Sequence, residues 1–154
     1  MKEKIISVIN QKGGVGKTTT VINLAAGLSL NGKKILVIDL DPQGNATTGL
    51  GLSNVADTNK SIYGVLNGKE EIQSSIQKTN FQNLDIVTSN VDLSGLEVET
   101  ADDENRAHLL RTKLTAYLNN SSHSYDYVLI DCPPSLSLLT AVSKLKDGGQ
   151  SIKT

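Results

Sequence analysis

Cysteine is nearly absent from this sequence, and so are the long apolar runs of membrane proteins. The 154 residues contain a single cysteine, Cys132, which excludes a disulfide within the chain and suits a reducing cytosol. No segment approaches the roughly 20 apolar residues of a membrane span. The start of the chain leads straight into a short apolar segment, without the long apolar core of a signal peptide. We therefore expect a cytoplasmic protein that does not associate with a membrane.

A surplus of charge is missing as well. Fifteen basic and sixteen acidic residues leave a formal net charge of −1, so no overall field attracts the chain to nucleic acid or to an anionic membrane. The two histidines, His108 and His123, have no metal-ligand spacing, and Cys132 has no histidine close to it in sequence. We interpret the cysteine as a small packing residue. The length and the hydrophobic fraction of 38% are sufficient for the core of one domain.

What the sequence does have is a glycine-rich loop between a predicted strand at residues 5–9 and a predicted helix at residues 17–30. Glycines let backbone N–H groups point inward, and the N-terminus of the following helix favours an anion. In this setting Lys17 would contact the β- and γ-phosphates of a nucleotide, and the Thr18 hydroxyl would bind Mg²⁺. The sequence therefore predicts a phosphate-binding loop formed by Gly13, Gly14, Val15, Gly16, Lys17, Thr18 and Thr19.

The remaining segments predict an α/β fold. Residues 35–38 are apolar at successive positions, which is typical of a parallel strand covered by helices on both faces. Residues 127–131 form a second such strand, which ends in Asp131. Hydrophobic periodicity indicates a helix that begins at residue 102 and buries Ala107, Leu110, Leu114 and Tyr117. It also indicates short helices near residues 62–66 and 70–76. A further strand is expected at residues 84–87, whereas residues 46–61 read as a loop.

Four segments resemble the ParA/MinD ATPases, namely residues 12–19, 38–45, 90–96 and 127–139. The loop has a second lysine, Lys12, at its head and lacks the glycine of the common P-loop, as in the deviant Walker A box. In that family the extra lysine reaches across a dimer to the partner's nucleotide. The segment at residues 39–45 resembles the family's "DxDPQGN" sequence, whose second aspartate, here Asp41, positions the attacking water. Asp39 is interpreted as structural. The strand ending in Asp131 resembles Walker B, which holds Mg²⁺, and residues 132–136 resemble the segment that senses the γ-phosphate.

The resemblance to the ParA/Soj partitioning ATPases covers residues 5–140. It implies a P-loop fold, slow hydrolysis of ATP with Mg²⁺, and catalytic roles for Lys12, Lys17 and Asp41. It also implies a homodimer in the ATP state, non-specific DNA binding, and a centromere-binding partner of the ParB type. A membrane-bound, septum-positioning relative would need a terminal amphipathic helix with a basic face, which residues 141–154 lack. An iron–sulfur relative would need more than one cysteine per subunit.

The expected organisation is an ATPase domain at residues 1–140, followed by a divergent polar tail at 141–154. Family members are longer, so we expect a truncated or frameshifted relative that lacks adenine contacts, dimer surface and DNA-binding residues. An inactive remnant that binds phosphate or nucleotide without turnover is the alternative function. The tail is expected to add no strand. Residues 5–9 would then form an exposed sheet edge and cause marginal stability or self-association.

Overall fold

The core of the molecule is a six-stranded sheet with the order β3-β4-β2-β5-β1-β6. The computed structural model describes residues 4–9, 17–52, 60–89, 104–120, 125–132 and 149–153. Only the pairing of β3 with β4 is antiparallel among the described strands, so the predicted mostly parallel sheet is confirmed. The strands are β1 (Lys4–Ile9), β2 (Ile35–Asp39), β3 (Ile76–Lys78), β4 (Leu84–Val87), β5 (Tyr127–Asp131) and β6 (Gly149–Lys153).

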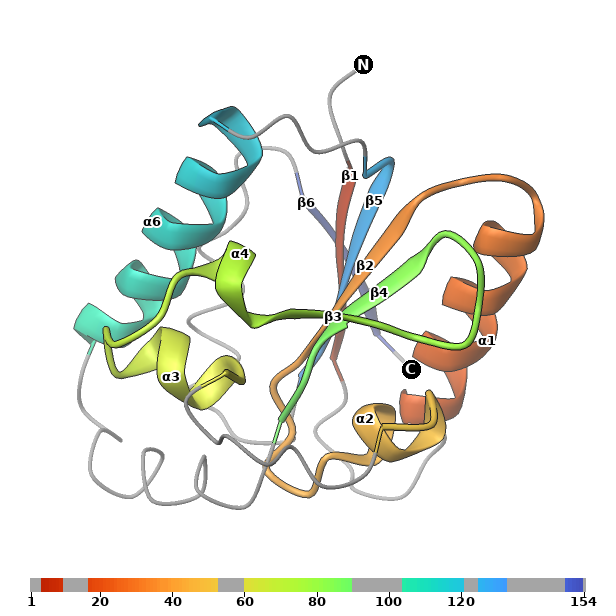
Figure 1. The fold of residues 1–154 in the computed structure, drawn as a ribbon, viewed down its shortest axis with the longest axis horizontal. Helices are drawn as coiled ribbons and strands as arrows, with labels where there is room; N and C mark the ends of the chain where they lie inside the picture. The colour runs from red at the N-terminus through yellow and green to blue at the C-terminus, as the bar shows by residue number, and fades with distance from the viewer. Residues whose placement is uncertain are drawn as a thin grey trace.

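Helices cover both faces of this sheet. They are α1 (Lys17–Leu30), α2 (Asn45–Gly49), α3 (Ile62–Leu66), α4 (Ile72–Ser75) and α6 (Glu104–Asn120). In Figure 1 the sheet is seen nearly edge-on, with α1 and α2 on one side and α3, α4 and α6 on the other. Strand β2 needs cover on both faces, because its successive apolar side chains point to opposite faces of the sheet. Ile35 and Val37 belong to the cluster that contains α1 residues, and Leu36 and Ile38 belong to the cluster that contains α6 residues.

Helix α1 has the predicted bounds. Val21 and Ala25 on its inner face are fully buried. The helix ends at Leu30 and is followed by Gly32, whose φ of +80° lies in the left-handed region that glycine adopts without strain. The amide of Gly32 donates to the carbonyl of Ser29, and that of Lys33 donates to Leu28. This pair of bonds is a Schellman motif, so the stop predicted at residues 31–32 is confirmed.

Three further elements agree with the sequence prediction. Helix α3 and strand β4 form at residues 62–66 and 84–87, as expected. Leu110 and Leu114 on α6 are almost fully buried, and Tyr117 is partly buried. The acidic residues 102 and 103, with which this helix was expected to begin, lie outside the described residues, as do residues 90–99, where a helical turn was expected.

Two elements near the middle of the chain were not predicted. Residues 45–49 form α2, although they read as a loop because they are rich in threonine, asparagine and glycine. The helix expected up to Ile76 already ends at Ser75, and Ile76 instead begins β3. Strand β3 pairs with β4, and this pairing satisfies backbone hydrogen-bonding groups of β4. The periodicity of apolar side chains gives no sign of such a pairing.

The expectation that the tail adds no strand is wrong. Residues 149–153 form β6, which pairs in parallel with β1 and places Ile5 opposite Gly149 and Val8 opposite Ile152. β1 is therefore internal, with β5 on its other side. The expected exposure of β1 is also wrong, and the predicted self-association through that edge loses its basis. Backbone hydrogen bonding does not require apolar side chains, so a polar segment is able to cover the edge.

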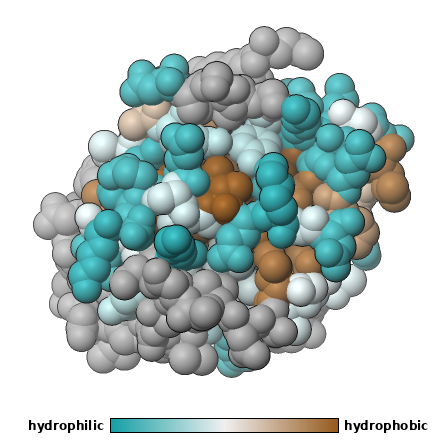
Figure 2. Space-filling model, in the orientation of Figure 1, coloured by the Kyte–Doolittle hydropathy of each residue, from teal (hydrophilic) through white to brown (hydrophobic). Residues whose placement is uncertain are grey.

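The outer surface is mostly hydrophilic on the face drawn in Figure 2, where hydrophobic residues form small separate patches. Among the described residues the large hydrophobic side chains with most exposure are Leu30, at 82%, and Phe81, at 41%. Within the same part of the chain, no helix has the length and apolar character needed to cross a bilayer.

Candidate functional site

The carboxyl ends of the parallel strands gather the polar residues that the sequence singled out. Asp39 ends β2 and Asp131 ends β5, and the two residues are register partners in neighbouring strands. Both are fully buried. Helix α1 begins at Lys17, after β1 ends at this edge, so the helix N-terminus faces the same region. The Thr18 Oγ1 atom donates a hydrogen bond of 3.1 Å to Asp131 Oδ2.

The pair of Thr18 and Asp131 has the chemistry of a magnesium site. A hydroxyl and a carboxylate oxygen are hard donors of the kind that Mg²⁺ prefers, and Mg²⁺ usually keeps several water ligands beside one or two from the protein. The charge of Asp131 raises the pKa of the neighbouring Asp39, and a cation bound at Asp131 would weaken that effect. The residues therefore fit a magnesium ion, and their role as ligands stays a prediction.

Asp39 is the hub of a buried hydrogen-bond network. Burial, together with a smaller effect of the charge of Asp131, raises the pKa of its carboxyl from 3.8 to about 7. Opposing this, Thr47 Oγ1 and the Thr47 amide donate to Asp39 Oδ2 at 2.7 and 2.9 Å. The Asp41 amide donates to Asp39 Oδ1 at 3.0 Å. These bonds tie the end of β2 to the segment that follows it, which is a structural role.

Asp41 lies in a tight turn directly after β2. The amide of Gly44 donates to the Asp41 carbonyl at 2.8 Å and closes the turn. The amide of Gln43 donates to Asp41 Oδ1 at 3.0 Å, and Ser89 Oγ donates to the Asp41 carbonyl at 2.6 Å. Gly44 has a φ of +64°, and a Cβ there would lie 3.4 Å from the Ser89 carbonyl oxygen. The positive φ therefore favours glycine here, whereas a Cβ would make only an ordinary contact with Ser89.

Much of the predicted loop is not described. Lys12, Gly13, Gly14, Val15 and Gly16 lie outside the described residues, and of Lys17 only its place in α1 is described. Thr19 is exposed on α1. The roles predicted for all of these residues stay predictions. Cys132 is buried in the core cluster between the sheet and α6, which confirms its interpretation as a packing residue.

Sequence reasoning missed Thr47 and Ser89. Both are buried, and the Ser89 amide donates to Thr47 Oγ1 at 3.0 Å across 42 positions of sequence. Threonine and serine are common in loops, so no local pattern marks these two. The available signal was that both follow strands of a parallel sheet, whose carboxyl ends meet at one edge.

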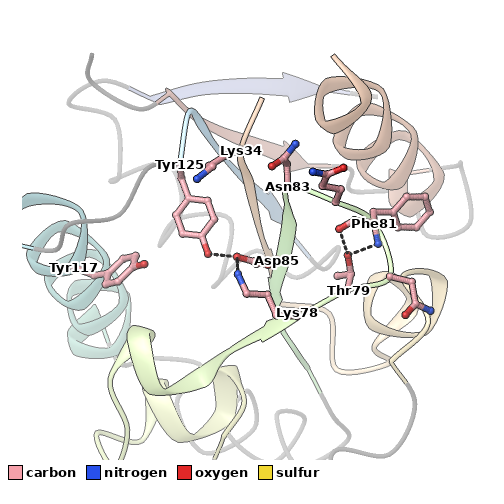
Figure 3. Close-up of a pocket in the computed structure, with 10 residues that line it drawn as sticks. Lys34, Lys78, Thr79, Phe81, Asn83, Asp85, Tyr117 and Tyr125 are labelled. Carbon is pink, nitrogen blue, oxygen red and sulfur yellow. Dashed lines mark hydrogen bonds and ion pairs between the residues drawn. The ribbon is translucent and has the colours of Figure 1, made fainter. Parts of the chain in front are cut away.

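A second polar region lies at the opposite edge of the sheet, where β2, β4 and β5 begin. It is a hollow of about 520 Å³ whose lining includes Lys34, Asp85 and Tyr125. Figure 3 shows the Tyr125 hydroxyl donating to Asp85, which also pairs with Lys78 at 2.9 Å. The pKa of Tyr125 is raised by burial and by Asp85, so the phenol keeps its proton. Asp85 is thus already satisfied by two donors.

The comparisons with known proteins agree with the site at the carboxyl edge. The sequence profile of a family described as AAA domain matches residues 3–146. The chain belongs to this family. The sporulation initiation inhibitor protein Soj of Bacillus subtilis is 46% identical over 137 residues, covering 89% of this chain and 52% of Soj. The chromosome partitioning protein ParA of Caulobacter vibrioides is 44% identical, with coverage of 89% and 50%. The resemblance to the ParA/Soj group is therefore confirmed.

Solved structures with a similar fold bind nucleotide. Cobyrinic acid a,c-diamide synthase from Mycobacterium smegmatis, with a bound ATP analogue and magnesium, superposes with a TM-score of 0.77 at 36% identity. The match covers 90% of this chain and 55% of the synthase. The chain thus spans about half the length of the curated relatives that it matches, and the activity of the whole relatives passes to it only as a proposal.

Proposed function

We propose that this chain is the ATP-binding part of a partitioning ATPase of the ParA/Soj type, in which slow hydrolysis of ATP controls dimerisation. The observation that carries the proposal is the hydrogen bond of 3.1 Å between Thr18 Oγ1 and Asp131 Oδ2, which joins residues 113 positions apart at the N-terminus of α1. The similarity to Soj and ParA, and the ATP analogue and magnesium in the related synthase, support Mg-ATP as the ligand.

In the proposed mechanism the protein contributes positioning and charge rather than covalent chemistry. The backbone amides of residues 12–19 and the Lys17 ammonium hold the phosphates, with Gly13, Gly14, Val15 and Gly16 forming the loop. Thr18 and Asp131 would hold Mg²⁺, which neutralises phosphate charge when bound. Asp41 orients the attacking water. Lys12 contacts the nucleotide of a second subunit, so hydrolysis requires the dimer.

The proposed partners follow from the family. They are a second copy of the chain in the ATP state, non-specific DNA and a centromere-binding protein of the ParB type. Residues 1–140 carry the ATPase domain in this proposal, and residues 141–154 form a divergent segment that includes β6. The protein would work in the cytoplasm, at the nucleoid where DNA binding is retained. Its cargo would be a chromosome or a plasmid.

The decisive experiment replaces Lys17 and measures nucleotide affinity. We expect Lys17→Ala to abolish binding of Mg-ATP and Mg-ADP in a calorimetric titration. Lys33→Ala is the matched control, because Lys33 is an exposed lysine beyond the other end of α1. It should bind as the unmodified protein does. Unchanged affinity in Lys17→Ala would overturn the phosphate assignment.

The alternative function is an inactive remnant that binds phosphate or nucleotide without turnover. Turnover measurements separate the two. Mg²⁺-dependent release of phosphate from ATP, measured with and without DNA, supports the dimerisation switch. Retained nucleotide binding with no turnover under either condition selects the remnant.

A further inference from the structure

Thr47 and Ser89 connect three separate segments at the edge of the sheet where Asp41 lies. From their contacts we infer that Thr47 and Ser89 are positioning residues, which hold Asp41 in place for the hydrolysis of ATP. This inference rests on the function proposed above, in which Asp41 orients the attacking water. The four residues Asp39, Asp41, Thr47 and Ser89 are called the Asp41 clamp below.

The Thr47 hydroxyl acts both as a hydrogen-bond donor and as an acceptor. It donates to Asp39 Oδ2 at 2.7 Å and accepts from the Ser89 amide at 3.0 Å. The Thr47 amide adds a second bond to Asp39 Oδ2 at 2.9 Å. One side chain on α2 therefore joins the end of β2 to the segment that follows β4. Valine, which has the same shape, would remove the donor and the acceptor together.

Ser89 completes the hold on Asp41 itself. Its hydroxyl donates to the Asp41 carbonyl at 2.6 Å, while the Asp41 amide donates to Asp39 Oδ1 at 3.0 Å. Both backbone polar atoms of Asp41 are thus bound to neighbours that Thr47 connects. The side chain is held as well, because Asp41 Oδ1 accepts from the Gln43 amide.

Burial makes this network stiff. Asp39 is fully buried, and Thr47, Ser89 and Asp41 are exposed by only 5%, 5% and 9%. Hydrogen bonds shielded from water are stronger, and each broken one leaves a buried group unsatisfied. A carboxylate that must orient a water molecule gains from such support, because small displacements of a positioned group slow a reaction strongly. The clamp therefore acts on turnover more than on nucleotide affinity.

The test compares three variants on α2. Thr47→Val removes the hydroxyl, Thr47→Ser keeps it, and Thr48→Val places the same valine at the exposed neighbouring position. We expect Thr47→Val to lower kcat for Mg-ATP by between about 10- and 100-fold with an unchanged Kd for Mg-ADP. Thr47→Ser and Thr48→Val should keep kcat near that of the unmodified protein. Ser89→Ala should lower kcat in the same manner as Thr47→Val.

A second measurement does not depend on turnover. Hydrogen exchange of the Asp41 amide reports the clamp directly, because this amide is bonded to Asp39 and not to Thr47. In Thr47→Val it should exchange about 10-fold faster or more, whereas amides within β2 and β5 should be unchanged. Absence of turnover in the unmodified protein would refute the proposed function alone.

Two results would overturn the clamp. One is an unchanged hydrogen-exchange rate of the Asp41 amide in Thr47→Val, whatever the ATPase activity of this variant. The other is a loss of kcat in Thr47→Ser or Thr48→Val equal to that in Thr47→Val, because the hydroxyl would then have no part in the effect.

Discussion

The buried carboxyl of Asp39 predicts how the stability of this protein depends on pH. Burial raises its pKa from 3.8 to about 7 in the folded chain, so the fold prefers the protonated form. Between these two pKa values the folded chain binds one proton more than the unfolded chain. Stability from this group is therefore complete at low pH and is lost as pH rises towards the folded pKa.

The magnitude follows from the two pKa values. Each pH unit between them lowers the free energy of unfolding by about 1.4 kcal/mol, and the slope flattens above the folded pKa. From about pH 5.5 to about pH 7.5 the loss amounts to about 2 kcal/mol. The side chain is fully buried, so no discount for solvent screening applies. Asp39→Asn has no ionisable group at this position and should lack this loss.

Urea unfolding without nucleotide or metal measures the effect. The unfolding free energy of the unmodified protein minus that of Asp39→Asn should fall by about 2 kcal/mol between the two pH values. Using the difference cancels the fixed cost of altered hydrogen bonds and the titration of other groups. Glu71→Gln is the control, since that side chain is 74% exposed. Parallel pH profiles for the unmodified protein and Asp39→Asn would refute the reasoning.

Two further predictions concern stability elsewhere in the fold. Tyr125→Phe removes a donor from Asp85 and should lower the free energy of unfolding by about 1–3 kcal/mol in urea titrations. Lys78 pairs with the same carboxylate but its side chain is 84% exposed, so Lys78→Met should lower the free energy of unfolding by less than about 1 kcal/mol. Equal losses in the two variants would contradict the assigned burial of Tyr125. Gly32→Ala should lower the melting temperature, because its φ of +80° costs a side chain about 1–2 kcal/mol. Gly27→Ala, within α1 and with open space around it, should raise that temperature, and a rise in both would disprove the strain at Gly32.

Much of the site could be predicted because it depends on short sequence patterns. The apolar run before Asp131 predicts a buried strand, and the glycines before Lys17 predict a turn into a helix. The resemblance to Walker B implies that Asp131 lies opposite Thr18, and parallel strands do bring their carboxyl ends to one edge. The hydrogen bond between them agrees with that expectation.

Other features depend on which segments become neighbours. The polar residues 149–153 pair with β1, although nothing in their composition predicts a strand. Thr47 and Ser89 meet across 42 positions only because the fold brings α2 beside the segment that follows β4.

The sequence by itself determined the alternation of strands and helices, the two-sided burial of β2 and the stop of α1 just before Gly32. Each of these depends on side-chain periodicity or on the backbone freedom of one residue, which are local properties. Only the tertiary structure decided the strand beside β1 and the support around Asp41. Backbone pairing is almost independent of side-chain identity, and a buried polar group takes whichever donor the fold brings within reach.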